Sequence, residues 1–239
     1  MSGPRTTARP GALAIGLLLA AVGASHADDG RADLAWLKSR CGDCHQLSAE
    51  ATSGHSAASR RLRKAPGLES AGVKFRRAWL ERWLSAPTRL RPAGFIPGVA
   101  TETQPEGDRI DANLLDAHPA LSATDAKRAA DALLALDHGA ERVVEGAYRK
   151  GALPRTMIEL NFTKFKGCGA CHRVAPDFGG VSGPELYTAF ERLDPDYLMS
   201  FISDPQAWDR YTPMPGYGLD AAEAGKLVDY LRILSEEDR

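Results

Sequence analysis

The sequence has few aromatic residues, few cysteines and no excess of either charge. Aromatic residues make up 7% of 239 residues, and 30 Lys and Arg residues face 31 Asp and Glu. This balance excludes binding to nucleic acid through a general excess of positive charge. The four cysteines exclude a small domain held by closely spaced disulfides. After residue 27, no apolar run is long enough to cross a bilayer.

The first 27 residues have the layout of a secretory signal peptide. Arg5 and Arg9 precede an apolar run over residues 11–23, and small residues follow as far as Ala27. This order predicts export to the periplasm with cleavage after Ala27. The alternative is an uncleaved membrane anchor, but the run is shorter than the roughly 17 to 25 residues of a transmembrane helix. We therefore expect an exported protein with no membrane span after signal cleavage.

The four cysteines form two pairs of the same spacing, each followed directly by a histidine. The two motifs are Cys41-Gly42-Asp43-Cys44-His45 and Cys168-Gly169-Ala170-Cys171-His172. In Cys-x-x-Cys-His, two thiols one helical turn apart can bind the two vinyl groups of a haem, while the histidine ligates the iron. Two covalently attached haem c groups are therefore predicted. The alternatives are disulfides or one zinc site built from all four cysteines, but zinc does not require a histidine after each pair.

The two halves of the chain share one order of features. Residues 66–97 align without a gap to residues 184–215, at an offset of 118. The alignment places Trp79 on Tyr197, Trp83 on Phe201, Pro87 on Pro205 and Pro97 on Pro215. Each half then ends in a segment with helical spacing of apolar residues, at 124–137 and 221–235, with Thr124 and Asp220 as expected N-caps. A tandem duplication accounts for this order.

No segment alternates clearly between apolar and polar residues, so we expect an all-α fold. The predicted organisation is a signal peptide at 1–27, a first helical domain at 28–138, a linker at 139–154 and a second helical domain at 155–239. Glycine, proline and charge interrupt the helical pattern in the linker. Each domain is expected to surround one covalent haem.

The sixth iron ligand is expected to differ between the halves. In the second half, Met214 lies between Pro213 and Pro215, and its soft sulfur would favour ferrous iron. The alignment places Ile96 at the corresponding position of the first half, and isoleucine cannot bind iron. His118 is one candidate replacement there, carried by an insertion over residues 98–116. His55 and a vacant coordination position are the alternatives.

These motifs, with Gly183-Pro184-x-Leu186 and Met214-Pro215, resemble the class I cytochrome c family, specifically its two-domain dihaem members. The resemblance implies two tandem class I cytochrome c-like helical domains. It also implies that the carbonyl of Pro184, and that of Pro66 in the first half, orient the proximal histidines. Known members are mostly electron carriers or electron-accepting subunits of periplasmic dehydrogenases. The implied partners are thus redox proteins: a dehydrogenase, a membrane quinol oxidoreductase or an oxidase.

The leading hypothesis from the sequence is electron transfer between such a donor and a downstream acceptor. The alternative is a haem enzyme or gas-binding protein in which an open first iron binds peroxide, nitric oxide or an oxidisable sulfur compound. All four cysteines would be used in haem attachment, so none would remain as a catalytic thiol or an unusual iron ligand.

Overall fold

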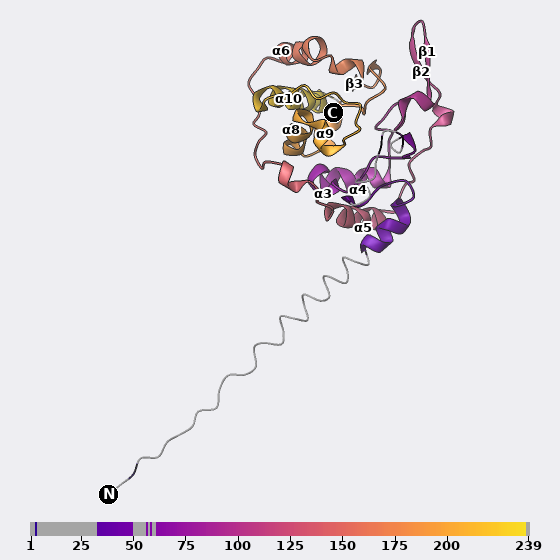
Figure 1. The fold of residues 1–239 in the computed structure, drawn as a ribbon, viewed down its shortest axis with the longest axis vertical. Helices are drawn as coiled ribbons and strands as arrows, with labels where there is room; N and C mark the ends of the chain where they lie inside the picture. Colours follow the sequence, from indigo (N-terminus) through magenta and orange to yellow (C-terminus); the bar gives the residue numbers. More distant parts are fainter. Residues whose placement is uncertain (1–2, 4–32, 50–55, 57, 59–60, 238–239) are drawn as a thin grey trace.

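The structure is a computed structural model that describes residues 3, 33–49, 56, 58 and 61–237. The predicted signal peptide lies outside these residues apart from Gly3, and so does its cleavage site. Figure 1 shows the two halves of the chain packed side by side. Within the described residues, no helix combines the length and the hydropathy that crossing a bilayer requires.

The first half begins with a helix over residues 33–41 that ends at the first cysteine. Its other elements are α3 (Ala71–Lys74), α4 (Arg77–Ser85), η2 (Pro97–Val99), β1 (Thr101–Gln104), β2 (Gly107–Ile110), η3 (Ala112–Leu114) and α5 (Ala123–Leu134). A short turn, η4 (Ala140–Arg142), begins the connection to the second half.

The second half begins with α6 (Arg155–Leu160), which continues directly into the π-helical turn η5 (Asn161–Phe165). The elements that follow are η6 (Cys168–Ala170), β3 (Arg173–Ala175), β4 (Phe178–Gly179), α7 (Ala189–Arg192), α8 (Pro195–Ser203), α9 (Pro205–Trp208) and α10 (Ala221–Glu237). Helices therefore carry most of the regular structure that is described.

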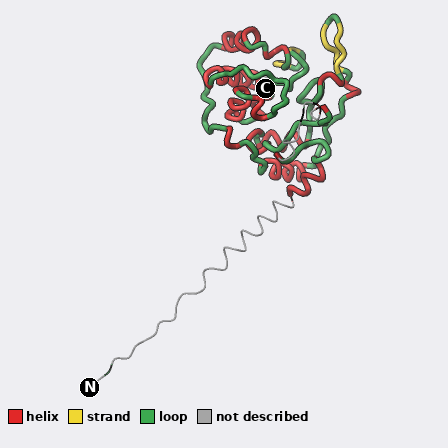
Figure 2. The backbone as a smooth tube through the Cα atoms, viewed as in Figure 1, coloured by secondary structure: helices red, strands yellow, loops and turns green. Residues whose placement is uncertain are grey.

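The expectation of an all-α fold of tandem cytochrome c-like helical domains is wrong. β1 pairs antiparallel with β2 in the first half, and β3 pairs antiparallel with β4 in the second. The β1–β2 hairpin projects from the body of the molecule (Figure 2). Its residues are mostly exposed on both faces, so the strands have no alternation of apolar and polar residues to reveal them. The available signals were turn residues: Gly107 in one hairpin, and Pro176-Asp177 followed by Gly179 in the other.

The offset of 118 found in the sequence also relates the helices. α3 and α4 begin and end at the positions that correspond to the bounds of α7 and α8. The Arg76 amide donates to the Arg192 carbonyl at 3.0 Å, and the Asp194 amide donates to the Lys74 carbonyl at 2.9 Å. Because the offset of 118 relates Arg76 to Asp194 and Lys74 to Arg192, the two bonds are equivalent under exchange of the halves. Phe75 pairs with Leu193 between them. The two halves therefore meet through an internal two-fold arrangement, as the subunits of a symmetric dimer do.

Each half has its own apolar core beside this joint. In the first half α5 packs on α4 and buries a face made largely of alanine. In the second half α10 packs against α6, α7 and α8. The N-cap of α5 is Ser122, whose hydroxyl accepts from the Asp125 amide, rather than the expected Thr124. Asp220 does cap α10, because its carboxylate accepts from the Glu223 amide at 2.8 Å.

The predicted linker over residues 139–154 is bound along the second half. The carboxylate of Asp196 accepts from the amides of Gly146 and Tyr148, at 2.6 and 2.7 Å. Asp229 on α10 accepts from the Tyr148 hydroxyl at 2.7 Å and from the Gly151 amide at 2.8 Å. Because Asp229 is only 3% exposed, these bonds satisfy a carboxylate that would otherwise be costly to bury.

Candidate functional site

The two Cys-x-x-Cys-His motifs adopt the same local turn. The amide of His45 donates to the Cys41 carbonyl at 2.8 Å, and the amide of His172 donates to the Cys168 carbonyl at 3.1 Å. The first cysteine of each motif is half-buried and the second, Cys44 or Cys171, is exposed. All four thiols are free rather than joined in disulfides. Each loop therefore presents two thiols and an imidazole on one tight turn.

Each motif histidine is held by the proline carbonyl that the family resemblance implied. His45 Nδ1 lies 2.8 Å from the Pro66 carbonyl oxygen, and His172 Nδ1 lies 2.7 Å from that of Pro184. A carbonyl only accepts, so Nδ1 carries the proton and Nε2 has a lone pair for a metal ion. Burial lowers the pKa of both histidines, which favours the neutral, ligating form at pH 7.

The segment behind each histidine is also duplicated. The Leu68 amide donates to the Gln46 carbonyl, and the Leu186 amide donates to the Arg173 carbonyl, both at 2.8 Å. In the second half the chain at Gly183 passes close to the imidazole ring of His172. A Cβ on Gly183 would lie 2.5 Å from Cε1 and 2.6 Å from Nδ1 of His172. Glycine is therefore required there by close packing against the histidine ring.

Replacing Gly183 by alanine should destabilise the second half. The added methyl group would overlap the His172 ring, and overpacking of this kind costs about 1–3 kcal/mol. We expect a lower midpoint in thermal unfolding and a weaker His172 contact to Pro184. The same offset of 118 relates Gly183 to Ala65, just before the aligned segment, so Ala65→Gly is the matched control and should have a smaller effect. Equal effects of the two substitutions would contradict the proposed close packing.

His118 lies beside the first motif histidine although 73 positions separate them in the chain. The ring centroids of His45 and His118 are 6.2 Å apart, with their planes inclined by 55°. Two imidazoles that bind one metal ion from opposite sides have centroids about 6.3 Å apart, from bonds of about 2.0–2.1 Å and roughly 1.1 Å within each ring. The observed separation is therefore compatible with both imidazoles binding one metal ion.

Several contacts hold the His118 ring. Its centroid is 4.7 Å from that of Trp83, whose indole N–H donates to the Thr88 carbonyl at 3.1 Å. His118 Nδ1 lies 2.9 Å from the Pro119 carbonyl oxygen, so its Nε2 is also left as the lone pair. Partial loss of solvation lowers the pKa of His118 as well. The side chain is nevertheless exposed, unlike those of the two motif histidines.

The loop that carries His118 is shorter than the predicted insertion over residues 98–116. The Asp111 amide donates to the Ala100 carbonyl at 2.9 Å, which closes the base of the β1–β2 hairpin. Only the chain after Asp111 therefore brings the histidine back to the site. Arg89 donates to the Leu115 carbonyl at 3.1 Å, and the Leu121 amide donates to the Leu84 carbonyl at 2.9 Å. These bonds fix both ends of the returning loop, and no sequence pattern identified Arg89 in this role.

Met214 lies in a loop between α9 and α10 and packs against the core of the second half. The side-chain amide of Gln206 donates to the Met214 carbonyl at 2.7 Å. Together with the flanking prolines, this bond restricts the loop. The predicted aromatic pairs also lie on single helix faces, with centroids 5.5 Å apart for Trp79 and Trp83 and 5.8 Å for Tyr197 and Phe201.

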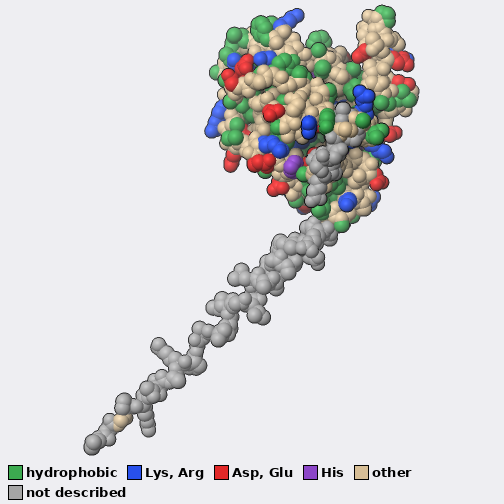
Figure 3. Space-filling model, viewed as in Figure 1, with side chains coloured by type: hydrophobic (Ala, Val, Ile, Leu, Met, Phe, Trp, Pro, Cys, Tyr) green, Lys and Arg blue, Asp and Glu red, His purple; other side chains and the backbone are tan. Residues whose placement is uncertain are grey.

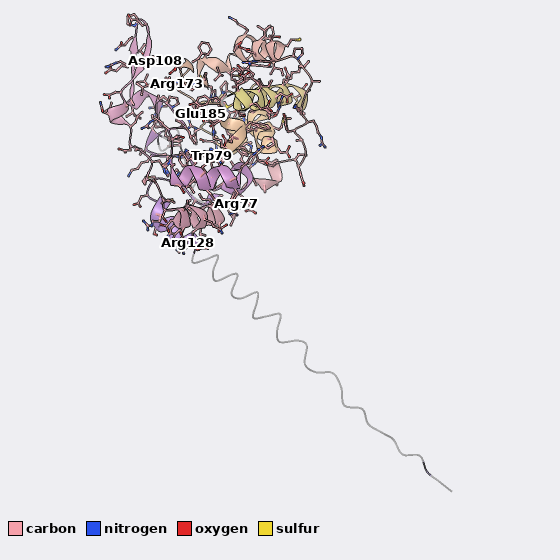
Figure 4. The ribbon with its side chains drawn as sticks, turned by 180° about the vertical axis from the view of Figure 1, so that it is seen from behind. Arg77, Trp79, Asp108, Arg128, Arg173 and Glu185 are labelled. Carbon is pink, nitrogen blue, oxygen red and sulfur yellow. The ribbon has the colours of Figure 1, made fainter. Side chains whose placement is uncertain are left out.

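The sequence reasoning missed a buried ion pair behind the second site. Glu185, which follows Pro184, is 2% exposed, and Arg192 is 4% exposed. Their side chains approach to 3.4 Å, and the Glu185 amide donates to the Leu90 carbonyl of the first half at 2.8 Å. Glu185 is labelled in Figure 4. The position of Pro184 is thus set partly by the first half.

The sequence analysis left two alternatives for metal binding, His55 as an iron ligand and a zinc site. His55 lies outside the described residues. Within the part of the chain that is described, which includes all four cysteines, no three His, Cys, Asp or Glu side chains lie close enough to share one metal ion. A zinc site assembled from both cysteine pairs therefore has no support in the described geometry.

No family model matches this chain, and neither the curated proteins nor the solved structures contain a match to it. The family resemblance and the haem sites are therefore predictions that rest on the motifs and on the geometry above.

Proposed function

We propose that this chain is an exported dihaem c-type cytochrome that passes electrons between a dehydrogenase or a membrane quinol oxidoreductase and a downstream acceptor. The observation that carries the proposal is the duplicated arrangement of His45 with Pro66 and His172 with Pro184. In both places a Cys-x-x-Cys turn is followed by an imidazole whose Nδ1 is occupied and whose Nε2 is available.

The residues present fit a covalently bound haem at both motifs. The thiols Cys41 and Cys44, or Cys168 and Cys171, would attach it by addition of each S–H across a vinyl double bond, which needs no oxidant. The neutral imidazole of His45 or His172 would hold the iron on one side. When bound, haem supplies one-electron oxidation and reduction. The protein would contribute the histidine ligands and, through the carbonyls of Pro66 and Pro184, their orientation.

The two sites would differ in potential because their distal ligands differ. The His118 ring lies beside His45, with centroids 6.2 Å apart, and if both imidazoles bind the first iron it would have two nitrogen ligands. Met214 would give the second iron a sulfur ligand, which raises the potential. Electrons would then pass from the first haem to the second. Separate reductive titration of the two haems is expected to show that the second is the more oxidising.

A second candidate function uses the first iron as a binding site for a small molecule such as peroxide or nitric oxide. The observation that favours it is the exposure of His118 on a surface loop, from which the imidazole could leave. The contacts of this ring with Trp83 and Pro119 favour the carrier instead. Carbon monoxide binding distinguishes the two functions, because a firmly ligated iron excludes the gas.

Covalent haem content tests the proposal directly. The chain would be produced in a bacterium that exports it and attaches haem c, and haem would be counted by intact mass and by the pyridine haemochrome spectrum. We expect two haems in the parent protein. Serine at both Cys168 and Cys171 should leave one haem, and serine at both Cys41 and Cys44 should leave the other. Parent protein with no covalent haem would refute the function.

A further inference from the structure

The loop that carries Met214 ends in an exposed stretch of chain. It runs from the end of α9 to the start of α10, and residues 215–218 all lie at the surface. Leu219, which is 8% exposed, returns the chain to the second core. The half-buried Met214 therefore lies at the inner end of a segment that burial alone does not fix. Its position depends on the hydrogen bonds of the loop.

One side chain of this exposed stretch crosses to the second Cys-x-x-Cys-His motif. The Tyr217 hydroxyl donates to the Lys166 carbonyl at 2.7 Å, although 51 positions separate the two residues. Lys166 lies two residues before Cys168. The bond therefore joins the loop of the expected sulfur ligand to the segment that carries the two cysteines. The loop is held at a second point by Gln206, which donates to the Met214 carbonyl at 2.7 Å.

Lys166, which accepts this bond, is itself held at both its backbone and its side chain. Its amide donates to the Asn161 carbonyl at 2.9 Å, at the end of η5. Its side chain is only 17% exposed, and the ammonium donates to a carboxylate oxygen of Glu223 on α10 at 3.1 Å. The same ammonium lies 5.8 Å from the centroid of the Tyr217 ring. Tyr217 thus ties the exposed stretch to a fixed point beside the motif.

The corresponding segment of the first half makes a different bond. Ser39 lies two residues before Cys41, and its hydroxyl donates to the Trp36 carbonyl at 2.8 Å. The loop that carries His118 is anchored by Arg89 and by its return to α4, as described above. The motif turns and the proline carbonyls are duplicated, whereas the anchoring of the distal loop is particular to each half. The bond from Tyr217 therefore belongs to the half that carries the methionine.

We propose that Tyr217 is a positioning residue that holds the Met214 loop closed against the second motif, and thereby sets how readily an external ligand replaces Met214 at the iron. This inference rests on the proposed function, including Met214 as the sixth ligand of the second haem. Tyr217 acts through its bond to Lys166 rather than at the iron. Without the hydroxyl, the bond from Gln206 would remain but the outer end of the loop would be released. One hydrogen bond of this kind shifts an equilibrium between open and closed states about 2- to 10-fold.

The test is the rate at which imidazole displaces Met214 from the oxidised second haem in the haem-loaded protein. Ferric iron bound to a methionine sulfur has a weak long-wavelength absorption band, and its loss reports on the second haem alone. At saturating imidazole the rate is limited by opening of the loop. Tyr217→Phe removes only the hydroxyl, so we expect the band to disappear about 2- to 10-fold faster than in the parent after stopped-flow mixing. Met214→Leu should lack the band, which would confirm its assignment.

Tyr148→Phe is the matched control for Tyr217→Phe. The Tyr148 hydroxyl also donates at 2.7 Å within the second half, but from the linker to Asp229 on α10, so this variant should keep the parent rate. If Tyr217→Phe does not fold, Glu223→Gln keeps the tyrosine but weakens the hold on Lys166, and a smaller acceleration is expected.

Altered attraction of the ligand would not account for a faster rate in Tyr217→Phe. The substitution changes no charge, and basic and acidic side chains are interspersed on the face that Figure 3 shows. A faster rate in this variant, with the parent rate in Tyr148→Phe, would therefore report on the loop.

Two results would overturn the inference while leaving the proposed function intact. One is an unchanged rate in Tyr217→Phe. The other is equal acceleration by Tyr217→Phe and Tyr148→Phe, which would indicate a general loosening of the second half. A parent with two covalent haems but no sulfur-to-iron band would reject Met214 as the ligand and the role of Tyr217 with it. Absence of covalent haem in the parent would reject both proposals.

Discussion

In the proposed dihaem form of the protein, replacing His118 by alanine should open the first haem to carbon monoxide. In the parent, His118 would occupy the iron and carbon monoxide could bind only after it dissociates, so binding is expected to be slow. If the dissociated state is populated at about 0.1–10%, removing the imidazole should accelerate binding roughly 10- to 1,000-fold. Stopped-flow mixing of the reduced protein with carbon monoxide measures this rate, and the second haem should stay unreactive.

Arg89→Ala provides an intermediate variant for the same experiment. It keeps the imidazole but removes the bond from Arg89 to the Leu115 carbonyl, which anchors the returning loop. We expect a binding rate between those of the parent and His118→Ala. Rapid, complete binding in the parent would exclude the carrier-only function. An unchanged first-haem spectrum in His118→Ala would exclude His118 as the ligand, and His55→Ala would then separate the other histidine from a vacant position.

Replacing Met214 by leucine should make the second haem harder to reduce. Leucine keeps the apolar packing against the second core but removes the sulfur that stabilises ferrous iron. We expect the potential to fall by on the order of 100 mV, within the range of about 0.8 V that axial ligands span. The second iron should also bind carbon monoxide. Spectroelectrochemical titration measures the potential of each haem.

Met199→Leu is the matched control for Met214→Leu. Met199 lies on α8, is buried in the same core and is 6% exposed. Met199→Leu makes the same chemical change at a residue with no expected role at the iron. The haem potentials and spectrum of this variant should therefore match those of the parent. If Met214→Leu also matched the parent, Met214 would not be the sixth ligand.

Much of the candidate site could be predicted from local sequence. The two Cys-x-x-Cys-His motifs form equivalent turns because five consecutive residues need only local hydrogen bonds to do so. The repeat offset of 118 seen in the sequence also relates the bounds of α3 to those of α7 and the bounds of α4 to those of α8. Motifs and helices can be recognised in a sequence because residues close along the chain form them, and a repeat shows the same local pattern twice.

The two small sheets were missed for a physical reason. β1 and β2 form a projecting hairpin with mostly exposed residues, so burial imposes no apolar alternation on them. The pair β3–β4 is too short to show a period of two. Hydrophobic periodicity reports burial rather than strand pairing, and these strands are exposed or only half-buried.

The two Cys-x-x-Cys-His motifs, their order and the difference between Met214 and Ile96 at aligned positions can be read from the sequence alone. Packing of distant segments brings the His118 ring beside His45, with centroids 6.2 Å apart, and lets Arg89 bond to the loop that carries it. It also pairs the backbone around Lys74 with that around Arg192. The difference between these two groups of features has one physical cause. Motif residues are neighbours along the chain, whereas these partners come together through packing of segments that no local pattern relates.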